Sequence, residues 1–178
     1  RVGIGHGYRQ DHHAQAVAMT SLVPTHTTNP DLHRLAQRIA ISQRDEIKLM
    51  QTWLRDHQQS VAAADTLVAQ QTAARSMDMP GMSMADSATA LMPGMLNPRQ
   101  MTELATATGA PFDSLFLRDM IRHHQGALTM VAKLLGTQGS AQESAVFQFA
   151  SSVDADQRAE IARMTGLLAA GPPSSTHR

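Results

Sequence analysis

The sequence His123-His124-Gln125-Gly126-Ala127-Leu128-Thr129-Met130 has a counterpart near the start of the chain, His12-His13-Ala14-Gln15-Ala16-Val17-Ala18-Met19. Both segments read H-H-x-x-A-x-x-M. Further along each half, a second shared pattern reads Q-R-x-E-I-x-x-M-x-x-x-L, over residues 43–54 and 157–168. Because two patterns recur in the same order, we interpret the chain as a duplication of one unit.

Each unit has the cap and turn signals of a pair of helices. Asn29-Pro30-Asp31 and Ala110-Pro111-Phe112-Asp113 are typical helix starts, since proline is favoured in the first turn and short polar side chains cap it. Gly109, Gly136 and Gly171 stand where the preceding helices are expected to end. Two duplicated helical hairpins predict an all-α fold, a four-helix bundle.

The predicted organisation is one helical domain with a tail. In chain order the parts are repeat one (5–72), a loop with no helical or strand period (76–98), repeat two (99–171) and a disordered tail (172–178), the domain itself spanning 1–171. The second helix of repeat one is expected to continue well beyond Trp53, because residues 61–74 hold good helix formers and no breaker. A short helix is expected from 98 to 108.

Composition excludes several classes of protein. Only 3% of the 178 residues are aromatic and 42% are hydrophobic, so aliphatic and methionine side chains must fill the core, which suits helices better than sheets. The formal net charge is zero and no basic stripe is present, which argues against a nucleic-acid partner. No apolar run approaches the roughly 18 residues of a membrane span. The absence of cysteine excludes disulfides and thiolate sites and leaves histidine and methionine as soft-metal ligands.

Helical periodicity places both histidine pairs on the apolar side of their helices. In the helix after Gly109, one face is polar throughout, and His123 and His124 lie on the wide apolar arc away from it. In the second helix of each unit a glutamate, Glu46 or Glu160, falls on the row of core residues. A buried carboxylate must be paired or bound to a metal. We therefore predict one central layer of histidines and glutamates near a pseudo-two-fold axis.

Two interpretations of this layer are open. Buried histidines are most often satisfied by structural hydrogen bonds, and a His–Glu bond would fix the register of two helices. Adjacent histidines that are repeated and followed by methionine favour a metal site, because imidazole and thioether together prefer copper to magnesium, calcium or manganese. Ala127 leaves room beside His123, and Met120 and Met130 reach toward the same region of the helix surface.

The methionines are concentrated in the predicted loop. The chain has 12, and seven of them fall between Met77 and Met101 with spacings that fit no helix. They either fold back over the bundle as adaptable hydrophobes or form a flexible thioether site for Cu(I) or Ag(I). Single methionines such as Met50 and Met164 are interpreted as core residues. The candidate loop ligands are Met77, Met79, Met82, Met84, Met92 and Met95.

The second repeat resembles a known family. The hallmark of the bacterial domain of unknown function family 305 is similar to Phe112-Asp113-x-x-Phe116-Leu117-x-x-Met120-Ile121-x-His123-His124-x-Gly126-Ala127-x-x-Met130, and the likeness extends over residues 8–57 and 92–168. The resemblance implies a ferritin-like four-helix bundle, a secreted or periplasmic location and copper handling, since some members are associated with copper binding and tolerance. The first repeat departs from the pattern, because Tyr8 and Arg9 stand in the places of Asp119 and Met120. This predicts the stronger site in the second half.

We therefore expect an extracytoplasmic copper-binding protein rather than an enzyme, which sequesters or transfers Cu(I) or Cu(II) and also accepts silver. The sequence shows no signal peptide, which fits a mature or trimmed chain and a cytoplasmic chain equally. The expected location therefore rests on the histidine and methionine ligands, which tolerate oxidising conditions better than thiols do. A copper-exchange protein or a second copy of the chain is the expected protein partner. The candidate helical ligands are His123, His124, Met120, Met130, His12, His13 and Met19, with Asp119, Glu46 and Glu160 orienting the imidazoles.

Two other functions are open. A ferritin-like di-metal carboxylate oxidoreductase would use two Glu-x-x-His motifs, and here Leu49 and Arg163 follow the core glutamates at that distance. A metal-free structural or interaction bundle would use the His–Glu layer for packing alone. That function predicts no change in stability when copper is added, whereas a ligand of the native state raises stability.

Overall fold

A computed structural model describes residues 4–61, 66, 68–70, 91–137 and 143–171, and the side chains of the first helix from Gln10 onward. Within these ranges the regular structure is helical throughout, which confirms the all-α prediction. The helices are α1 (Ile4–Thr20), α2 (Val23–His26), α3 (Pro30–Asp56), α5 (Pro98–Thr106), α6 (Gly109–Gly136) and α7 (Ser144–Ala170).

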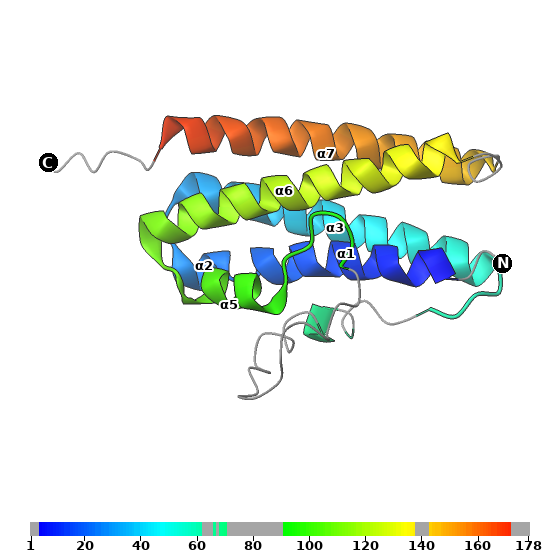
Figure 1. Cartoon of the computed structure of the whole chain (residues 1–178), viewed down its shortest axis with the longest axis horizontal. Helices are drawn as coiled ribbons and strands as arrows, with labels where there is room; N and C mark the ends of the chain where they lie inside the picture. The colour runs from blue at the N-terminus through cyan, green and yellow to red at the C-terminus, as the bar shows by residue number, and fades with distance from the viewer. Residues whose placement is uncertain (1–3, 62–65, 67, 71–90, 138–142, 172–178) are drawn as a thin grey trace, which may run out of the picture.

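The four long helices lie side by side as two hairpins (Figure 1). Helix α1 packs along α3, and α6 packs along α7, so each repeat forms one hairpin as the duplication predicted. The hairpins meet through α1 against α6 and α3 against α7. The short helices α2 and α5 cover one end of the bundle, and the end of α6 and the start of α7 lie at the other.

Side-chain caps start the helices where the sequence placed them. Asn29 accepts the backbone N–H groups of Asp31 and Leu32 at 3.1 and 3.4 Å, so α3 begins at Pro30. Asn97 and Gln100 form a reciprocal capping box at the start of α5, which confirms the short helix predicted after residue 98. Helix α6 begins at Gly109, one residue before the expected start.

The second helix of repeat one is shorter than predicted. Helix α3 ends at Asp56, three residues after Trp53. Gln58 follows in the left-handed region (φ 56°), and the Gln59 N–H donates back to the Leu54 carbonyl at 2.8 Å. This backbone turn satisfies the last carbonyls of the helix and ends it in spite of the helix formers that follow. The prediction of continuous helix into 61–74 is therefore wrong at Asp56.

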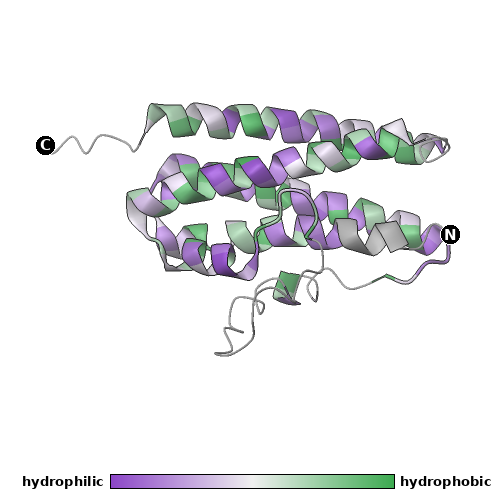
Figure 2. Ribbon diagram, viewed as in Figure 1, coloured by the Kyte–Doolittle hydropathy of each residue, from purple (hydrophilic) through white to green (hydrophobic). Residues whose placement is uncertain are grey.

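The main core lies at the end covered by α2 and α5. It is built from aliphatic, methionine and two phenylalanine side chains that are almost fully buried, among them Met19, Leu32, Phe112, Phe116 and Met164. Hydrophilic and hydrophobic residues are mixed along every long helix in Figure 2, as expected when one side of each helix faces the interior. Among the described residues, none of the helices combines the length and the apolar character that a membrane crossing requires.

Candidate metal centre

A layer of buried histidines and glutamates crosses the middle of the bundle. His13 Nε2 on α1 lies 2.6 Å from Glu46 Oε2 on α3, and His124 Nε2 on α6 lies 2.6 Å from Glu160 Oε2 on α7. All four residues are buried. The two contacts occupy equivalent positions of the two repeats, as expected for one central layer of histidines and glutamates.

The first histidine of each pair faces its counterpart across the two hairpins. The rings of His12 and His123 have centroids 3.8 Å apart and an interplanar angle of 36°. His123 is fully buried, and among the described residues neither of its ring nitrogens has a hydrogen-bond partner. A buried polar atom without a partner is uncommon and is a sign of a missing water or ion.

Burial keeps both inner histidines neutral. The pKa of His12 falls to about 3, chiefly because burial disfavours the charged ring and secondly because His13 is close. The pKa of His123 is lowered well below 6.5 by burial first and by the neighbouring histidines next, His12 foremost. Neutral imidazole is the form that binds metals, so this pair needs no deprotonation at neutral pH.

A short segment before α5, which we call the strap (residues 92–97), is docked over the inner histidine pair. The His12 Nε2–H donates to the Pro93 carbonyl at 3.1 Å. One turn further along α1, the Gln15 amide donates to the Leu96 carbonyl at 2.9 Å and accepts the Leu96 N–H at 2.7 Å. In Figure 1 this segment arches from α1 toward α6 before α5 begins.

Glycine makes the other contact of the strap possible. A Cβ added to Gly126 of α6 would lie 1.8 Å from the Pro93 carbonyl oxygen, and one added to Gly94 would lie 2.5 Å from the Arg122 carbonyl oxygen. Both are backbone contacts that cannot shift without moving the strap or the helix. The strap therefore touches α1 through side chains and α6 through bare backbone, next to His123.

The predicted methionine ligands occupy different surroundings. Met19 and Met120 are fully buried in the main core, Met130 is half-buried on α6, and Met92 and Met95 are half-buried in the strap. Met92 and Met95 flank Pro93, whose carbonyl accepts from His12, and a separate soft site made by the loop methionines stays a prediction. The remaining loop candidates, Met77, Met79, Met82 and Met84, lie outside the described residues.

The three carboxylates predicted to orient the imidazoles also lie in different surroundings. Glu46 and Glu160 each contact a histidine of the layer, in both repeats the second one of the pair. Asp119 pairs with Arg122 at 3.3 Å, and its orienting role stays a prediction. Within the part of the chain that the structure covers, no three His, Asp or Glu side chains gather as a metal cage. This arrangement differs from a di-metal carboxylate centre, which needs several carboxylates at one point.

Comparison with known proteins places this arrangement in a family. The sequence profile described as Domain of unknown function (DUF305) matches residues 9–168. The chain belongs to the DUF305 family. The resemblance expected from the histidine motif is thereby confirmed, while no curated protein matches the chain significantly.

Solved DUF305 structures share the fold. A presumed secreted DUF305 protein from Streptomyces coelicolor is 25% identical with a TM-score of 0.69, over 92% of this chain and 91% of its own. A DUF305 fragment from Deinococcus radiodurans is 25% identical with a TM-score of 0.69, over 96% and 99%. CopM in its Cu(II)-bound form is 25% identical with a TM-score of 0.67, over 93% of both chains. CopM is also known in Cu(I)-bound and Ag-bound forms, each with a TM-score of 0.59.

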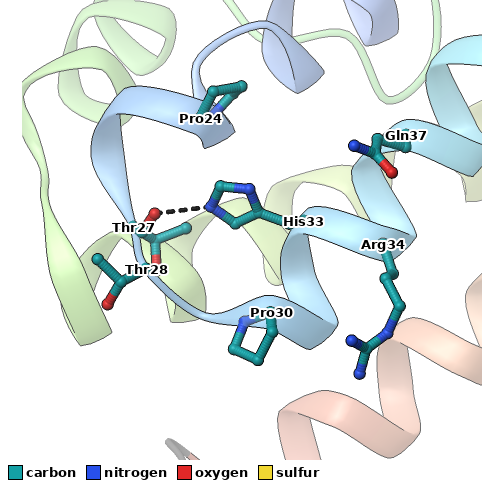
Figure 3. Close-up of a pocket in the computed structure, with 7 residues that line it drawn as sticks. All are labelled: Pro24, Thr27, Thr28, Pro30, His33, Arg34 and Gln37. Atoms are coloured by element: carbon teal, nitrogen blue, oxygen red, sulfur yellow. Dashed lines mark hydrogen bonds between the residues drawn. The ribbon is translucent and has the colours of Figure 1, made fainter.

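A hollow on the surface of this DUF305 chain lies away from the histidine layer, at the turn between α2 and α3 (Figure 3). It measures about 460 Å³, and His33 on its wall donates from Nε2 to the Thr27 carbonyl at 2.8 Å. The hollow is open and shallow, with Arg34 already paired to Asp31. It brings none of the predicted ligands together.

Sequence reasoning missed the residues that seat the strap in this DUF305 protein. Gln15 was an unassigned position inside the first histidine motif, and Pro93 and Gly94 were unremarked loop residues. The available signal was Gly126, a glycine in the interior of a helix, because such a residue is unfavourable unless another backbone approaches it closely.

Acid is expected to destabilise the metal-free DUF305 chain through the inner histidines. Their unfolded pKa is near 6.5 and their folded pKa is lower, so below pH 6.5 the unfolded state binds protons that the fold excludes. Each histidine then removes about 1.4 kcal/mol of unfolding free energy per pH unit, until its folded pKa is reached. Urea unfolding at pH 7.5, 6.5 and 5.5 checks this, and His123→Leu should make the slope shallower. A stability that is flat between pH 6.5 and 5.5 would contradict it.

Proposed function

We propose that this protein binds copper, as Cu(I) or Cu(II), outside the cytoplasm, and sequesters it or passes it to another protein. The observation that carries the proposal is the His12–His123 pair: two neutral imidazoles in contact, one of them fully buried, with no hydrogen-bond partner for either of its nitrogens among the described residues. Such a group destabilises the fold by about 1–3 kcal/mol unless it gains a partner. A ligand function explains why the residue is there.

The residues at this site fit copper. Imidazole suits copper in both oxidation states, and thioethers favour the Cu(I) state. His12 and His123 would hold the ion, and Met92 and Met95 would supply thioether donors from the strap, whose Pro93 carbonyl accepts from His12. His13 and His124, each tied to a glutamate, would keep the layer in register and the neighbouring rings in place.

The relatives support the same reading. CopM, which shares the fold and a quarter of the residues, binds Cu(II), Cu(I) and silver. A presumed secreted relative and the cysteine-free set of ligands support a location outside the cytoplasm. A copper-exchange protein or a second copy of this chain is the partner that copper transfer requires. The loop methionines 77–84 are proposed as a further soft site.

Adding copper is expected to raise the melting temperature of the protein. A ligand present at a hundred times its dissociation constant stabilises the native state by about 2.7 kcal/mol. Thermal unfolding with Cu(II), with Cu(I) under reducing conditions and with Mg²⁺ checks this, together with calorimetry of the intact chain and of a variant lacking residues 76–90. The deletion stops before the strap, because the strap is docked on α1 and α6.

Loss of only the Cu(I) component in the deletion variant would assign the soft site to the loop. If neither form of copper changes the melting temperature more than Mg²⁺ does, the copper proposal is wrong and the histidine layer is structural.

A further inference from the structure

The strap contains a tight turn over the residues Met92-Pro93-Gly94-Met95. The Met95 N–H donates to the Met92 carbonyl at 3.1 Å, and Gly94 has a φ of 80°. Proline at the second position and a glycine with positive φ at the third are the features of a type II turn. The hydrogen bond that closes the turn uses the Met92 carbonyl, so the Pro93 carbonyl at the centre accepts from outside the strap.

The donor that meets this carbonyl is the His12 ring. His12 Nε2 lies 3.1 Å from the Pro93 oxygen, and a carbonyl oxygen can only accept, so Nε2 must carry a ring proton. The buried ring is neutral and has one such proton, so its lone pair is on Nδ1. The strap thus selects one of the two tautomers of this histidine, and with it the nitrogen that can bind a metal.

An oxygen acceptor at Nε2 recurs in the histidine layer. Glu46 takes this place for His13 and Glu160 for His124, each at 2.6 Å. The Nδ1 atom of His124 is buried, and no residue that the structure describes forms a hydrogen bond with it. An oxygen acceptor on the second nitrogen is the usual means by which proteins orient a metal-binding imidazole. His12 has the same support, but from the strap instead of a glutamate.

Gln15 holds the strap in position on α1. Its buried side-chain amide donates to the Leu96 carbonyl at 2.9 Å and accepts the Leu96 N–H at 2.7 Å. Two hydrogen bonds to the backbone of one residue fix both the position and the orientation of the strap, three residues after Pro93. The Leu96 side chain is itself buried in the main core. The Gln15 amide therefore keeps the Pro93 carbonyl at a fixed place opposite His12.

We propose that His12 binds the metal ion through Nδ1, and that Gln15 is a positioning residue, which keeps the Pro93 carbonyl on Nε2 and so fixes this tautomer. The inference deepens the proposed copper function and rests on it. Binding through Nε2 would remove the proton from that atom, break its bond to the strap and leave the Pro93 carbonyl without this donor. His123 has no acceptor of this kind among the described residues, so its donor nitrogen is not fixed before the ion arrives.

Side-chain ¹⁵N NMR of the histidines in the full chain tests this, because the shifts of the two ring nitrogens show which of them is protonated. A His12→Asn variant assigns the signals of the ring by their absence. In the metal-free protein, His12 is expected in the Nε2–H form alone. Silver is the probe, since Ag(I) is diamagnetic and does not change oxidation state. On titration with Ag(I), the Nδ1 signal of His12 should shift while Nε2 keeps its proton.

Replacing Gln15 with methionine removes the amide and keeps an unbranched side chain. The Gln15→Met variant should show both tautomers of His12 and bind Ag(I) about 10–100 times more weakly, the usual effect of losing a partner that orients a ligand. Gln10→Met is the matched control, because Gln10 is equally buried on α1 and its amide nitrogen has no hydrogen-bond partner among the described residues. It should keep the wild-type tautomer and affinity. Loss of packing alone would lower the stability of either variant without changing which nitrogen of His12 is protonated.

The possible results separate this inference from the general copper function. A mixture of His12 tautomers in the metal-free wild type would overturn the inference. So would a silver-dependent loss of the Nε2 proton, or a Gln15→Met variant with the wild-type tautomer and affinity. These results concern only which nitrogen binds and what holds it, so the proposed function would stand. If no histidine nitrogen responds to Ag(I) at any concentration, the His12–His123 pair does not bind the soft ion and both proposals fall.

Discussion

Replacing His123 with leucine is expected to stabilise the metal-free protein and to weaken its copper binding at the same time. The substitution removes two buried nitrogens for which the described part of the chain supplies no partner, and it puts an apolar side chain of similar size in the same space. The unfolding free energy should therefore rise by about 1–3 kcal/mol. Copper affinity should fall at least about a hundredfold, the upper end of what losing an outer-shell partner costs. Urea unfolding without metal and a competition titration with a copper chelator measure the two effects.

A control histidine behaves in the opposite way. His33 on α3 donates a hydrogen bond to the Thr27 carbonyl at 2.8 Å, far from the layer. His33→Leu should lower the unfolding free energy by about 1 kcal/mol, the usual net value of a hydrogen bond, and leave copper binding as it was. If His123→Leu destabilised the metal-free protein and bound copper normally, His123 would be a structural residue.

Replacing Gly126 with alanine is expected to destabilise the protein by about 3 kcal/mol. The new methyl group would lie 1.8 Å from the Pro93 carbonyl oxygen, so the strap must leave α6. Forcing extra volume into a packed contact costs about 1–3 kcal/mol. Moving the strap would also weaken its hydrogen bonds with His12 and Gln15, which adds about 1 kcal/mol for each bond. The better helix propensity of alanine offsets only about 1 kcal/mol of this. Thermal unfolding followed by circular dichroism gives the difference.

Gly166 of α7 is the matched control for that substitution. It is also a glycine inside a long helix, but an added Cβ would meet nothing within 4 Å. Gly166→Ala should therefore stabilise the protein by about 0.5–1 kcal/mol through propensity alone. The same sign of change in both variants would show that the strap is not held by backbone contact at Gly126.

The helices and the composition of the buried layer could be predicted from the sequence. Helical register alone placed Glu46 and Glu160 on the core rows, and duplication required them to meet the histidines in a repeated way. The register does not say which histidine of each pair meets the glutamate. Adjacent residues point about 100° apart on a helix, and the rotation of each helix against its neighbours decides which of them faces inward. The structure gives His13 and His124 to the glutamates and leaves His12 and His123 facing each other.

The strap and the small space lined by His13, Met50 and Met130 could not be predicted, for different reasons. Residues 92–97 have no period, and they are held by the Gln15 amide and by the bare backbone of Gly126, contacts that exist only after the hairpins assemble. Met50 has the spacing of a core residue and is one. Whether Met50 borders an unfilled space depends on how side chains from four helices pack together. The spacing of residues along one helix does not determine that packing.

Gln15 and Gly126 occupy the same position of the repeated motif, two residues after the second histidine. Gln15 holds the strap by hydrogen bonds, and Gly126 leaves room for the backbone of the strap. The strap can dock only because the two copies of the motif differ at this position. Glutamine in both copies would leave no room for the strap against α6, and glycine in both copies would leave the strap without the amide hydrogen bonds on α1. Divergence at this one duplicated position makes the two faces of an otherwise symmetric bundle different. The face of the bundle at which the strap docks is therefore chemically different from the opposite face, although both are built from copies of one motif.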